Sequence, residues 1–436
     1  MSRNITFTVQ PGGCLKGRVR VPGDKSISHR VIMFGALANG ESHASGFLQS
    51  EDTRATMSAF QQMGVRISAD DLGNVYIHGV GLRGLSAPQQ PLDLGNSGTS
   101  ARLMSGLLAG QAFSSEIIGD ASLTRRPMDR VVLPLRQMGA NIETSAAGTL
   151  PMKIQGQALT GIDYTLPVAS AQLKSCLLLA GLYADGETVI HEPTATRDHT
   201  ERMLSACGYP VQIIDGTLRL RGGTELQPFD IQIPADISSA AFFLVGASIA
   251  PESDLLIEAV GINPTRSAVV DILRLMGAQI DIRNKRLLGG EPVADLHIGA
   301  ARLRGIDIPP ALVSIAIDEF PAIMVAAACA DGRTLLSGAE ELRYKESDRI
   351  ESVAAGLRVL GITVETSPDG MIVEGGKLQG GEVISQGDHR ISMAFAMAGL
   401  AASGQVVIKD CANVGTSYPG FAESAQQLGL EIEVRE

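Results

Sequence analysis

The chain of 436 residues contains no tryptophan, and aromatic residues make up only 4% of the sequence. Proteins that bind single-stranded nucleic acid stack bases on aromatic side chains, so the composition does not favour that role. The formal net charge of −11 also has the wrong sign for a general binder of polyanions. We therefore expect no nucleic-acid partner, and any anionic ligand must be bound by local clusters of lysine and arginine.

Cysteine pairs, metal motifs and long apolar runs are also missing. The five cysteines are scattered and odd in number, which is typical of reduced thiols in a cytoplasmic protein. The sequence has no CxxC, HExxH or HxH pattern, so no metal site is predicted. Its longest apolar runs are too short to cross a bilayer, and its first residues do not resemble a signal peptide. These features predict a cytoplasmic protein without a membrane partner.

An apolar helical pattern that ends in glycine recurs six times, at intervals of about 70 residues. The positions one, four and eight residues before the glycine are mostly apolar, which is the spacing of one helix face. A glycine can take the left-handed conformation that ends a helix, and the alternating residues after it predict a strand. The six glycines are Gly64, Gly139, Gly208, Gly277, Gly361 and Gly429. Because the period is too long for a solenoid, the pattern predicts six copies of a small α/β unit.

Each copy contains a second predicted helix that begins at a capping residue. These predicted starts are Asp24, Asn96, Ser170, Asp236, Asp318 and Asp388. Helix amino ends carry free N–H groups and partial positive charge, so they attract anions. If three copies pack around a local three-fold axis in each half, facing halves would line one cleft for a substrate with several phosphate or carboxylate groups. Taken singly, an arginine or cap at a helix start is more often solvated or structural.

Six short segments, taken together and in order, resemble the 5-enolpyruvylshikimate-3-phosphate synthase family. They are PGDKSISHR at 22–30, LGNSGT at 94–99, RPM at 126–128, ASAQLK at 169–174, RYKESDR at 343–349 and DHR at 388–390. The resemblance implies an α/β (α+β) fold of two domains with six βαβαββ repeats, three per domain, in an inside-out α/β barrel. The first domain would comprise 1–22 plus 237–436 and the second 23–236, with the hinge near 22–23 and 234–236.

The same resemblance implies the reaction. Enzymes of this family join shikimate 3-phosphate and phosphoenolpyruvate, release phosphate, and need no metal or organic cofactor. The 5-hydroxyl adds to C2 of the enolpyruvyl group while C3 is protonated, and a proton then leaves C3 as phosphate departs. Such a site needs an acid, a base and several cations to hold two anions together.

The resemblance implies residue roles by position within these six segments and within two further matching ones, TRDHT at 196–200 and DEFP at 318–321. The residues implied to bind shikimate 3-phosphate are Lys25, Ser26, Arg30, Ser170, Ala171, Gln172, Arg197, Asp318 and Lys345. Those implied to bind phosphoenolpyruvate are Lys25, Gly98, Arg126, Gln172, Arg349 and Arg390. The implied catalytic residues are Lys25, Asp318, Glu346 and His389. Asp318 would accept the hydroxyl proton and Glu346 would carry a proton at C3, although the division between acid and base stays open. Arginine forks match carboxylate and phosphate geometry.

The chain departs from some family members near its carboxyl end, where Thr416-Ser-Tyr-Pro419 replaces a Lys-Thr-Phe-Pro stretch. Together with the segments at 169–174, 196–200 and 318–321, this stretch resembles the second subclass of the family, whose members often tolerate glyphosate. The retained Gly98 and the leucine at position 103, which is proline in many sensitive members, give conflicting signals. We expect inhibition by glyphosate that is weakened but not abolished.

Two classes of alternative remain. The sister enzyme that transfers enolpyruvyl to UDP-N-acetylglucosamine typically has a cysteine in a mobile loop, and residues 119–127 contain none. A non-catalytic anion-binding protein would be favoured by loss of Lys25, Asp318 or Glu346, and all three are present. An RNA-end-processing relative would be favoured by a basic surface and aromatic side chains that read bases, and the sequence indicates neither. A monomer is expected, with the halves drawn together when shikimate 3-phosphate neutralises cationic residues.

Overall fold

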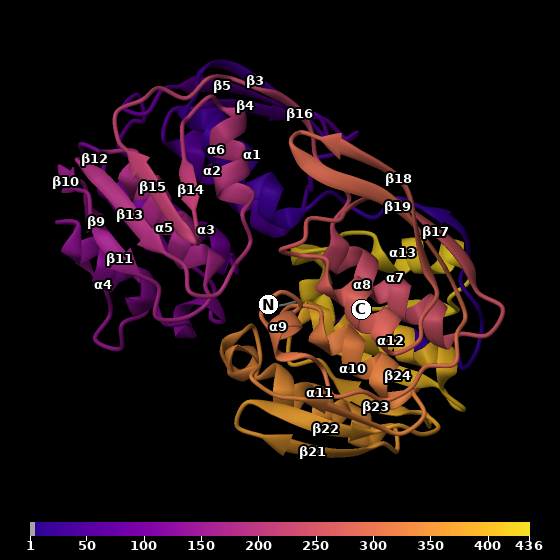
Figure 1. Ribbon diagram of the computed structural model, residues 1–436. Coiled ribbons are helices and arrows are strands. Elements are labelled where there is room, and N and C mark those ends of the chain that lie inside the picture. The colour runs from indigo at the N-terminus through magenta and orange to yellow at the C-terminus, as the bar shows by residue number, and fades with distance from the viewer. Residues whose placement is uncertain (1–4) are drawn as a thin grey trace. The chain divides into compact units, whose positions relative to one another are not determined.

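The computed structural model describes residues 5–436, and contacts between residues divide the chain into two compact units (Figure 1). Unit 1 contains the chain up to Pro22, Pro234–Leu287 and Glu291–Glu436. Unit 2 contains Gly23–Ile233 and the short segment Leu288–Gly290. Apart from that segment, the chain passes from one unit to the other at two points, after Pro22 and after Ile233.

All six predicted glycine-terminated helices are present. They are α2 (Glu51–Gln62), α4 (Asp129–Gln137), α6 (His199–Ala206), α8 (Ala268–Leu275), α11 (Arg349–Val359) and α13 (Phe421–Leu428). The six glycines that follow them have φ angles from 72° at Gly208 to 112° at Gly429. An L-residue with a side chain is strained in this region, whereas glycine is not, so these glycines end the helices without a steric penalty.

The second helix of each repeat is also present, and these six helices are α1 (Lys25–Leu37), α3 (Gly98–Ala109), α5 (Ala171–Gly181), α7 (Ile237–Ile249), α10 (Phe320–Ala328) and α12 (His389–Ala398). Two predicted starts need correction. Ser97 rather than Asn96 caps α3, because its hydroxyl accepts the backbone N–H of Ser100. Helix α10 begins after Glu319 without a side-chain cap, since Pro321 fits a first turn that needs no N–H donor. Asp318 therefore lies just outside the helix.

Unit 2 contains three four-stranded sheets with one common pattern, a parallel pair at one edge followed by two antiparallel pairings. The first is β16 (Asp230–Gln232), β3 (Asn39–Ser45), β5 (Val75–Val80) and β4 (Arg66–Ala69). The second is β6 (Leu92–Asp93), β7 (Ser114–Ile118), β9 (Met152–Gln155) and β8 (Asn141–Glu143). The third is β11 (Asp163–Thr165), β13 (Glu187–His191), β15 (Thr217–Arg221) and β14 (Gln212–Ile214), and β10 (Leu159–Thr160) pairs with β12 (Ala184–Asp185).

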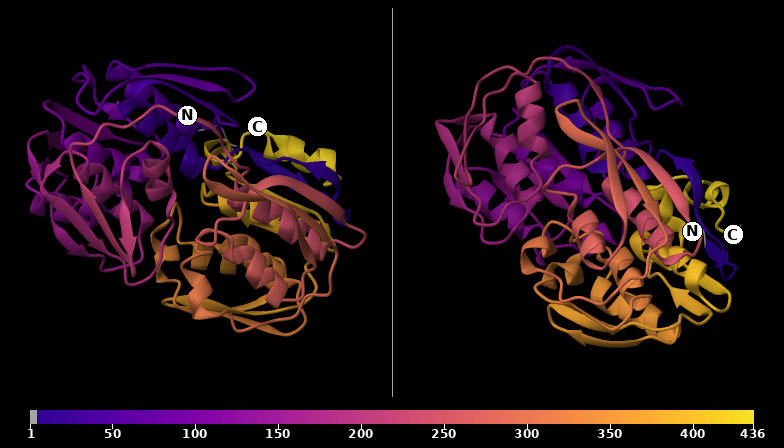
Figure 2. Two further views of the ribbon diagram at one scale, coloured as in Figure 1. Left: turned by 45° about the horizontal axis from the view of Figure 1, so that its top comes forward. Right: turned by 45° about the vertical axis from the view of Figure 1, so that its right-hand side comes forward.

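Unit 1 has three further sheets. They are β18 (Ile280–Leu288), β19 (Glu291–Gly299), β17 (Asp254–Gly261) and β2 (Lys16–Val19); β20 (Arg333–Leu336), β22 (Gly370–Glu374) and β21 (Thr363–Ser367); and β23 (Gly381–Ile384), β24 (Val406–Lys409), β1 (Thr6–Val9) and β25 (Ile432–Arg435). Strand β1 pairs antiparallel with both β24 and β25, so the first strand lies among the last ones (Figure 2). Short helical segments are α9 (Pro310–Val313), η1 (Leu123–Arg125), η2 (Glu340–Tyr344), η3 (Gly399–Ala401) and η4 (Ala412–Thr416).

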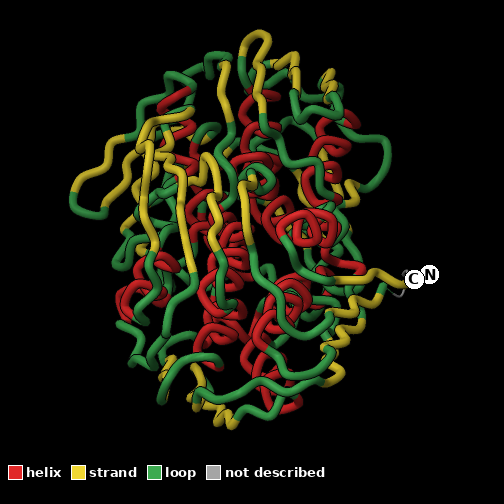
Figure 3. The backbone as a smooth tube through the Cα atoms, turned by 90° about the vertical axis from the view of Figure 1, so that its right-hand side faces the viewer, coloured by secondary structure: helices red, strands yellow, loops and turns green. Residues whose placement is uncertain are grey.

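Each unit has its own hydrophobic core, built around the second helices of its repeats. In unit 1, α7, α10 and α12 contact one another and are buried on almost every side, as expected for helices that are apolar all round. The sheets lie outside these helices, as the separation of strands and helices in Figure 3 illustrates. This arrangement, in which several sheets surround the central helices of each unit, confirms the predicted fold class. Among the described residues, no helix combines the length and apolar character needed to cross a membrane.

Candidate active site

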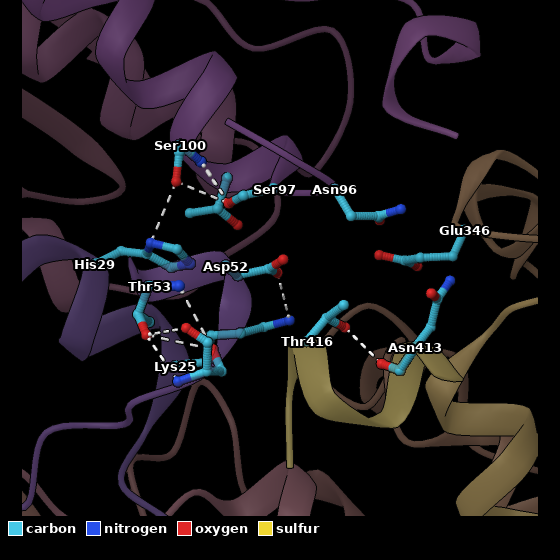
Figure 4. Close-up of polar contacts among 12 residues, drawn as sticks. Lys25, His29, Asp52, Thr53, Asn96, Ser97, Ser100, Glu346, Asn413 and Thr416 are labelled. Atoms are coloured by element: carbon cyan, nitrogen blue, oxygen red, sulfur yellow. Dashed lines mark hydrogen bonds and ion pairs between the residues drawn. The ribbon is translucent and has the colours of Figure 1, made fainter. Parts of the chain in front are cut away.

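The amino ends of α1 and α2 bring a lysine and an aspartate together in unit 2 (Figure 4). Asp24 caps α1 by accepting the N–H of Ile27, which fixes Lys25 as the first helical residue. The Lys25 ammonium lies 3.1 Å from an oxygen of Asp52, in the first turn of α2, and both side chains are largely buried. The lysine implied by the sequence to act in both binding and catalysis is thus held by a carboxylate.

Arg30 lies one turn further along α1 and is almost completely buried. Its Nε donates to the Thr200 hydroxyl, its Nη2 donates to the Ser175 hydroxyl, and its Nη1 donates to the backbone carbonyl of Ser26. These bonds join α1 to α5 and α6. The guanidinium is therefore held rigidly among hydroxyl groups, close to Ser26 at the start of the helix.

A second group of polar side chains surrounds the start of α3. A Cβ atom built on Gly98 would lie 2.9 Å from Nη1 of Arg102 and 3.1 Å from Nη1 of Arg126, so both guanidinium groups approach this glycine closely. Nη2 of Arg126 donates to the side-chain carbonyl of Asn96 at 2.6 Å. Nη1 of Arg102 donates to the Gln172 side chain at 2.9 Å, which connects the start of α3 with that of α5. Glycine leaves room for these cations beside the helix amino end.

Hydroxyl groups and one histidine connect the same helix starts in the unit 2 core (Figure 4). Nδ1 of His29 lies 2.8 Å from the Thr56 hydroxyl and 3.2 Å from that of Ser100, and the latter lies 2.7 Å from Ser97 Oγ. Burial, and then the charges of Lys25 and Arg30, hold the pKa of His29 well below its ordinary value. The ring is therefore neutral at pH 7 and acts as a hydrogen-bonding link rather than as a cation.

In unit 1, the Asp318 carboxylate lies between two cations. Its Oδ1 is 3.3 Å from Nη1 of Arg349 and 3.5 Å from the Lys345 ammonium. Arg349 is the first residue of α11, and its Nη2 also lies 2.6 Å from Glu346. The structure thus brings together four residues that the sequence nominated from two separate segments. Nearby cations stabilise the ionised form of a carboxylate.

A buried ion pair anchors this group. The Arg349 side chain is 1% exposed, and its Nε lies 2.8 Å from an oxygen of Asp388, whose side chain is fully buried. Burial lowers the pKa of Arg349, but Asp388, Glu346 and Asp318 outweigh it and raise the pKa above its ordinary value. Burial conversely raises the pKa of Asp388, and the guanidinium outweighs it so that the pKa is lowered. Both groups are charged at pH 7.

The remaining nominated residues of unit 1 lie at the start of α12. Asp388 caps this helix by accepting the Arg390 N–H, and His389 is its buried first residue. Nη1 of Arg390 donates to the Asp318 carbonyl at 2.9 Å and lies 3.6 Å from the Glu319 carboxylate. Glu319 also accepts a hydrogen bond from Ser238 at the start of α7. The starts of α7, α10 and α12 are therefore connected.

Ser170, Ala171 and Gln172 begin α5, where the Ser170 hydroxyl accepts the N–H of Leu173. Arg197 lies between β13 and α6 and is half-buried. Thr416 stands where some family members have a lysine. Its hydroxyl donates a hydrogen bond to the Asn413 carbonyl at 2.7 Å (Figure 4).

Sequence reasoning missed four residues that position the nominated ones. They are Asp52, Arg102, Glu319 and Asp388 as an ion-pair partner. Arg102 lies four residues after Gly98, a helical spacing that could have identified it. The contacts of Asp52 and Asp388 are long-range and leave no local pattern.

These features define a class of protein: two α/β units of three repeats each, whose helix amino ends carry lysines, arginines and carboxylates. The sequence model of the protein family EPSP synthase (3-phosphoshikimate 1-carboxyvinyltransferase) matches residues 9–425 of this chain. A relative from Methylococcus capsulatus named 3-phosphoshikimate 1-carboxyvinyltransferase is 59% identical over 433 residues, with 99% of each chain covered. One of that name from Hydrogenovibrio crunogenus is 58% identical over 440 residues, also with 99% of each covered.

A solved structure gives the same result. EPSP synthase from Acinetobacter baumannii superimposes with a TM-score of 0.89 and 53% identity, covering 99% of this chain and all of that one. The chain belongs to the EPSP synthase family and is an enzyme of the transferase class. The alternative of a UDP-N-acetylglucosamine enolpyruvyl transferase is not favoured.

Proposed function

We propose that this chain transfers the enolpyruvyl group of phosphoenolpyruvate to the 5-hydroxyl of shikimate 3-phosphate and releases phosphate. The observation that carries the proposal is the position of Asp318, whose carboxylate is held between Lys345 and Arg349. An ionised carboxylate beside two cations can accept a hydroxyl proton while the cations hold an anionic substrate. No metal or organic cofactor enters the proposed reaction.

Nine residues are assigned to the binding of shikimate 3-phosphate. In unit 2 they are Lys25, Ser26, Arg30, Ser170, Ala171, Gln172 and Arg197, and in unit 1 they are Asp318 and Lys345. The hydrogen bonds of Arg30 to Ser175 and Thr200 support a pre-organised role, because a fixed guanidinium loses little freedom when an anion binds. Arg197 is assigned to the phosphate group.

Phosphoenolpyruvate is assigned to Lys25, Gly98, Arg126, Gln172, Arg349 and Arg390. The close approach of Arg126 to Gly98 supports this assignment, because a carboxylate or phosphate there would meet both a guanidinium fork and free N–H groups of α3. Glyphosate is proposed as a weakened inhibitor at the same groups, with Gly98 leaving room for it.

Proton transfer is assigned to unit 1. As the O–C2 bond forms, Asp318 takes the proton of the 5-hydroxyl and Glu346 delivers a proton to C3. In the second step Glu346 takes a proton back from C3 as the C2–O bond to phosphate breaks, and the proton held by Asp318 leaves with the phosphate. Arg349 contacts both carboxylates and keeps them in position, while His389 is assigned a supporting hydrogen bond.

The experiment is an assay of phosphate release from phosphoenolpyruvate, with shikimate 3-phosphate or UDP-N-acetylglucosamine as the acceptor. Release only with shikimate 3-phosphate is expected. Release only with the nucleotide sugar, or with neither acceptor, would refute the proposal. A parallel reaction in D2O should place deuterium at C3 of the product, because an addition step makes C3 a methyl group that exchanges one hydrogen with solvent.

A further inference from the structure

Lys174 is a buried lysine on α5 that the proposed reaction does not use. Its side chain is 1% exposed, and a buried ammonium must be paired to be tolerated. Its Nζ lies 2.7 Å from Glu201 Oε1, 3.0 Å from Glu192 Oε1 and 3.4 Å from the backbone carbonyl of Thr196. One side chain therefore contacts three points along the single stretch 192–201.

These partners enclose the loop that carries Arg197. Glu192 follows β13, at the beginning of the loop, and Glu201 lies in the first turn of α6, just beyond its end. Glu192 Oε1 also accepts the backbone N–H of Thr196 at 2.8 Å, and it accepts a second hydrogen bond from the Thr196 hydroxyl. Both ends of the loop, and the residue immediately before Arg197, are thus connected to the same ammonium.

The helix that carries Lys174 also carries other proposed ligands. Ser170 caps α5, Ala171 and Gln172 begin it, and the Lys174 N–H donates to the Ser170 carbonyl. A rigid helix turn therefore separates Lys174 from the Ser170–Gln172 segment, while Thr196 separates it from Arg197. This lysine fixes the distance between two groups that would hold the same substrate.

We propose that Lys174 is a positioning residue for shikimate 3-phosphate, which holds the loop of Glu192 to Asp198 so that Arg197 faces the substrate's phosphate. The inference rests on the proposed function, because it takes Arg197 as a phosphate ligand. It assigns no chemical step to Lys174.

The local charges explain why a lysine is required. Two carboxylates face one ammonium, so the group is anionic overall when all three are ionised. Burial raises the pKa of Glu201, and Lys174 opposes this effect. Without the ammonium, the two carboxylates would be unpaired and would repel each other, which would release the loop.

The test is a double-mutant cycle of Lys174→Met and Arg197→Ala, read as KM for each substrate. Arg197→Ala should raise KM for shikimate 3-phosphate about tenfold or more, the range for a lost hydrogen bond to a charged group. Lys174→Met should raise the same constant by a similar factor and change KM for phosphoenolpyruvate less than about threefold. In the Arg197→Ala background, Lys174→Met should have almost no further effect on KM for shikimate 3-phosphate.

The outcomes separate the two proposals. If Arg197→Ala leaves KM for shikimate 3-phosphate unchanged, the proposed ligand assignment is wrong. If Arg197→Ala raises KM for shikimate 3-phosphate, the ligand assignment stands. The positioning role is then wrong if Lys174→Met leaves this KM unchanged, if it raises this KM by the same factor with and without Arg197, or if it raises the KM values of both substrates equally.

Two further variants guard against a misfolded protein. Glu192→Gln keeps the shape of the group and leaves Lys174 paired with Glu201, so it should fold, and its effect on KM should have the same direction but be smaller. If Lys174→Met does not fold, the cycle of Glu192→Gln with Arg197→Ala decides by the same criteria. Lys153→Met, at an exposed lysine of β9 in the same unit, is the matched control and should leave both KM values unchanged.

Discussion

Replacing Arg349 with methionine should destabilise the protein in a pH-dependent way. The substitution removes the cation that contacts Asp388, Glu346 and Asp318. Asp318 still has Lys345 as an ion-pair partner in the variant. Glu346 is partly exposed, so solvent screens the loss of its ion pair with Arg349. Asp388 is fully buried and loses its only described ion-pair partner. Breaking a buried pair by removing one partner costs about 3–5 kcal/mol, so we expect a loss of about 3 kcal/mol in the free energy of unfolding at pH 7.

The direction of the pH dependence follows from Asp388. In the unaltered protein its pKa is lowered, so the ionised carboxyl contributes stability above the unfolded pKa of about 4, and this contribution is lost as pH falls through the lower folded value. Without Arg349, burial would instead raise the pKa of Asp388. The variant then protonates this carboxyl as pH falls toward about 4, and the difference from the unaltered protein should shrink to about 1 kcal/mol.

Urea unfolding, followed by circular dichroism at pH 7 and near pH 4.5, measures both quantities. Arg358→Met is the matched control, since Arg358 lies on the same helix but donates, among residues 5–436, only to the Val364 carbonyl. It should cost about 1 kcal/mol at both pH values. A loss below about 1 kcal/mol for Arg349→Met at pH 7, or an equal loss at both pH values, would refute the reasoning.

Three further predictions concern other contacts. Gly98→Ala should fold, because the new methyl would crowd the flexible ends of Arg102 and Arg126 and would lie at an ordinary contact distance of 3.8 Å from Leu123. It should raise KM for phosphoenolpyruvate and the inhibition constant of glyphosate while KM for shikimate 3-phosphate stays constant; equal effects on both KM values would contradict this. Asp318→Asn, assayed by phosphate release, should lower kcat by about 10²–10⁴-fold, the range for a lost general base, with KM for phosphoenolpyruvate nearly unchanged; retention of normal kcat would exclude Asp318 as the base. Gly356→Ala should cost about 1–3 kcal/mol in urea unfolding, because its methyl would lie 2.2 Å from the Phe395 ring, whereas an unchanged urea midpoint would mean that the ring can move aside.

Most of the fold could be predicted from the sequence because its signals are local. A helix face, the glycine that ends it and the alternation that follows all lie within about 20 residues, as in α2, Gly64 and β4. The predicted start of α10 at Asp318 is wrong because Pro321 permits a first turn without a capping side chain.

The site was less accessible to local reasoning. Family resemblance nominated Asp318, Lys345, Glu346 and Arg349, and the structure brings these four together. It could not indicate Asp52, Glu192 or Glu201, because their ion pairs with Lys25 and Lys174 depend on which segments meet in space. A single carboxylate in a sequence does not reveal which cation it faces.

The pairing of β1 with β24 and β25 has a consequence for biosynthesis. Almost all of unit 2 has been synthesised once Ile233 has been made, and this unit can fold while translation continues. Strand β1, although made first, has no partner until the last strands appear. At about 5–20 residues per second, the remaining stretch of about 200 residues takes roughly 10–40 s to synthesise. During that interval the oldest part of the nascent chain is an unpaired strand edge, exposed to chaperones and to other nascent chains.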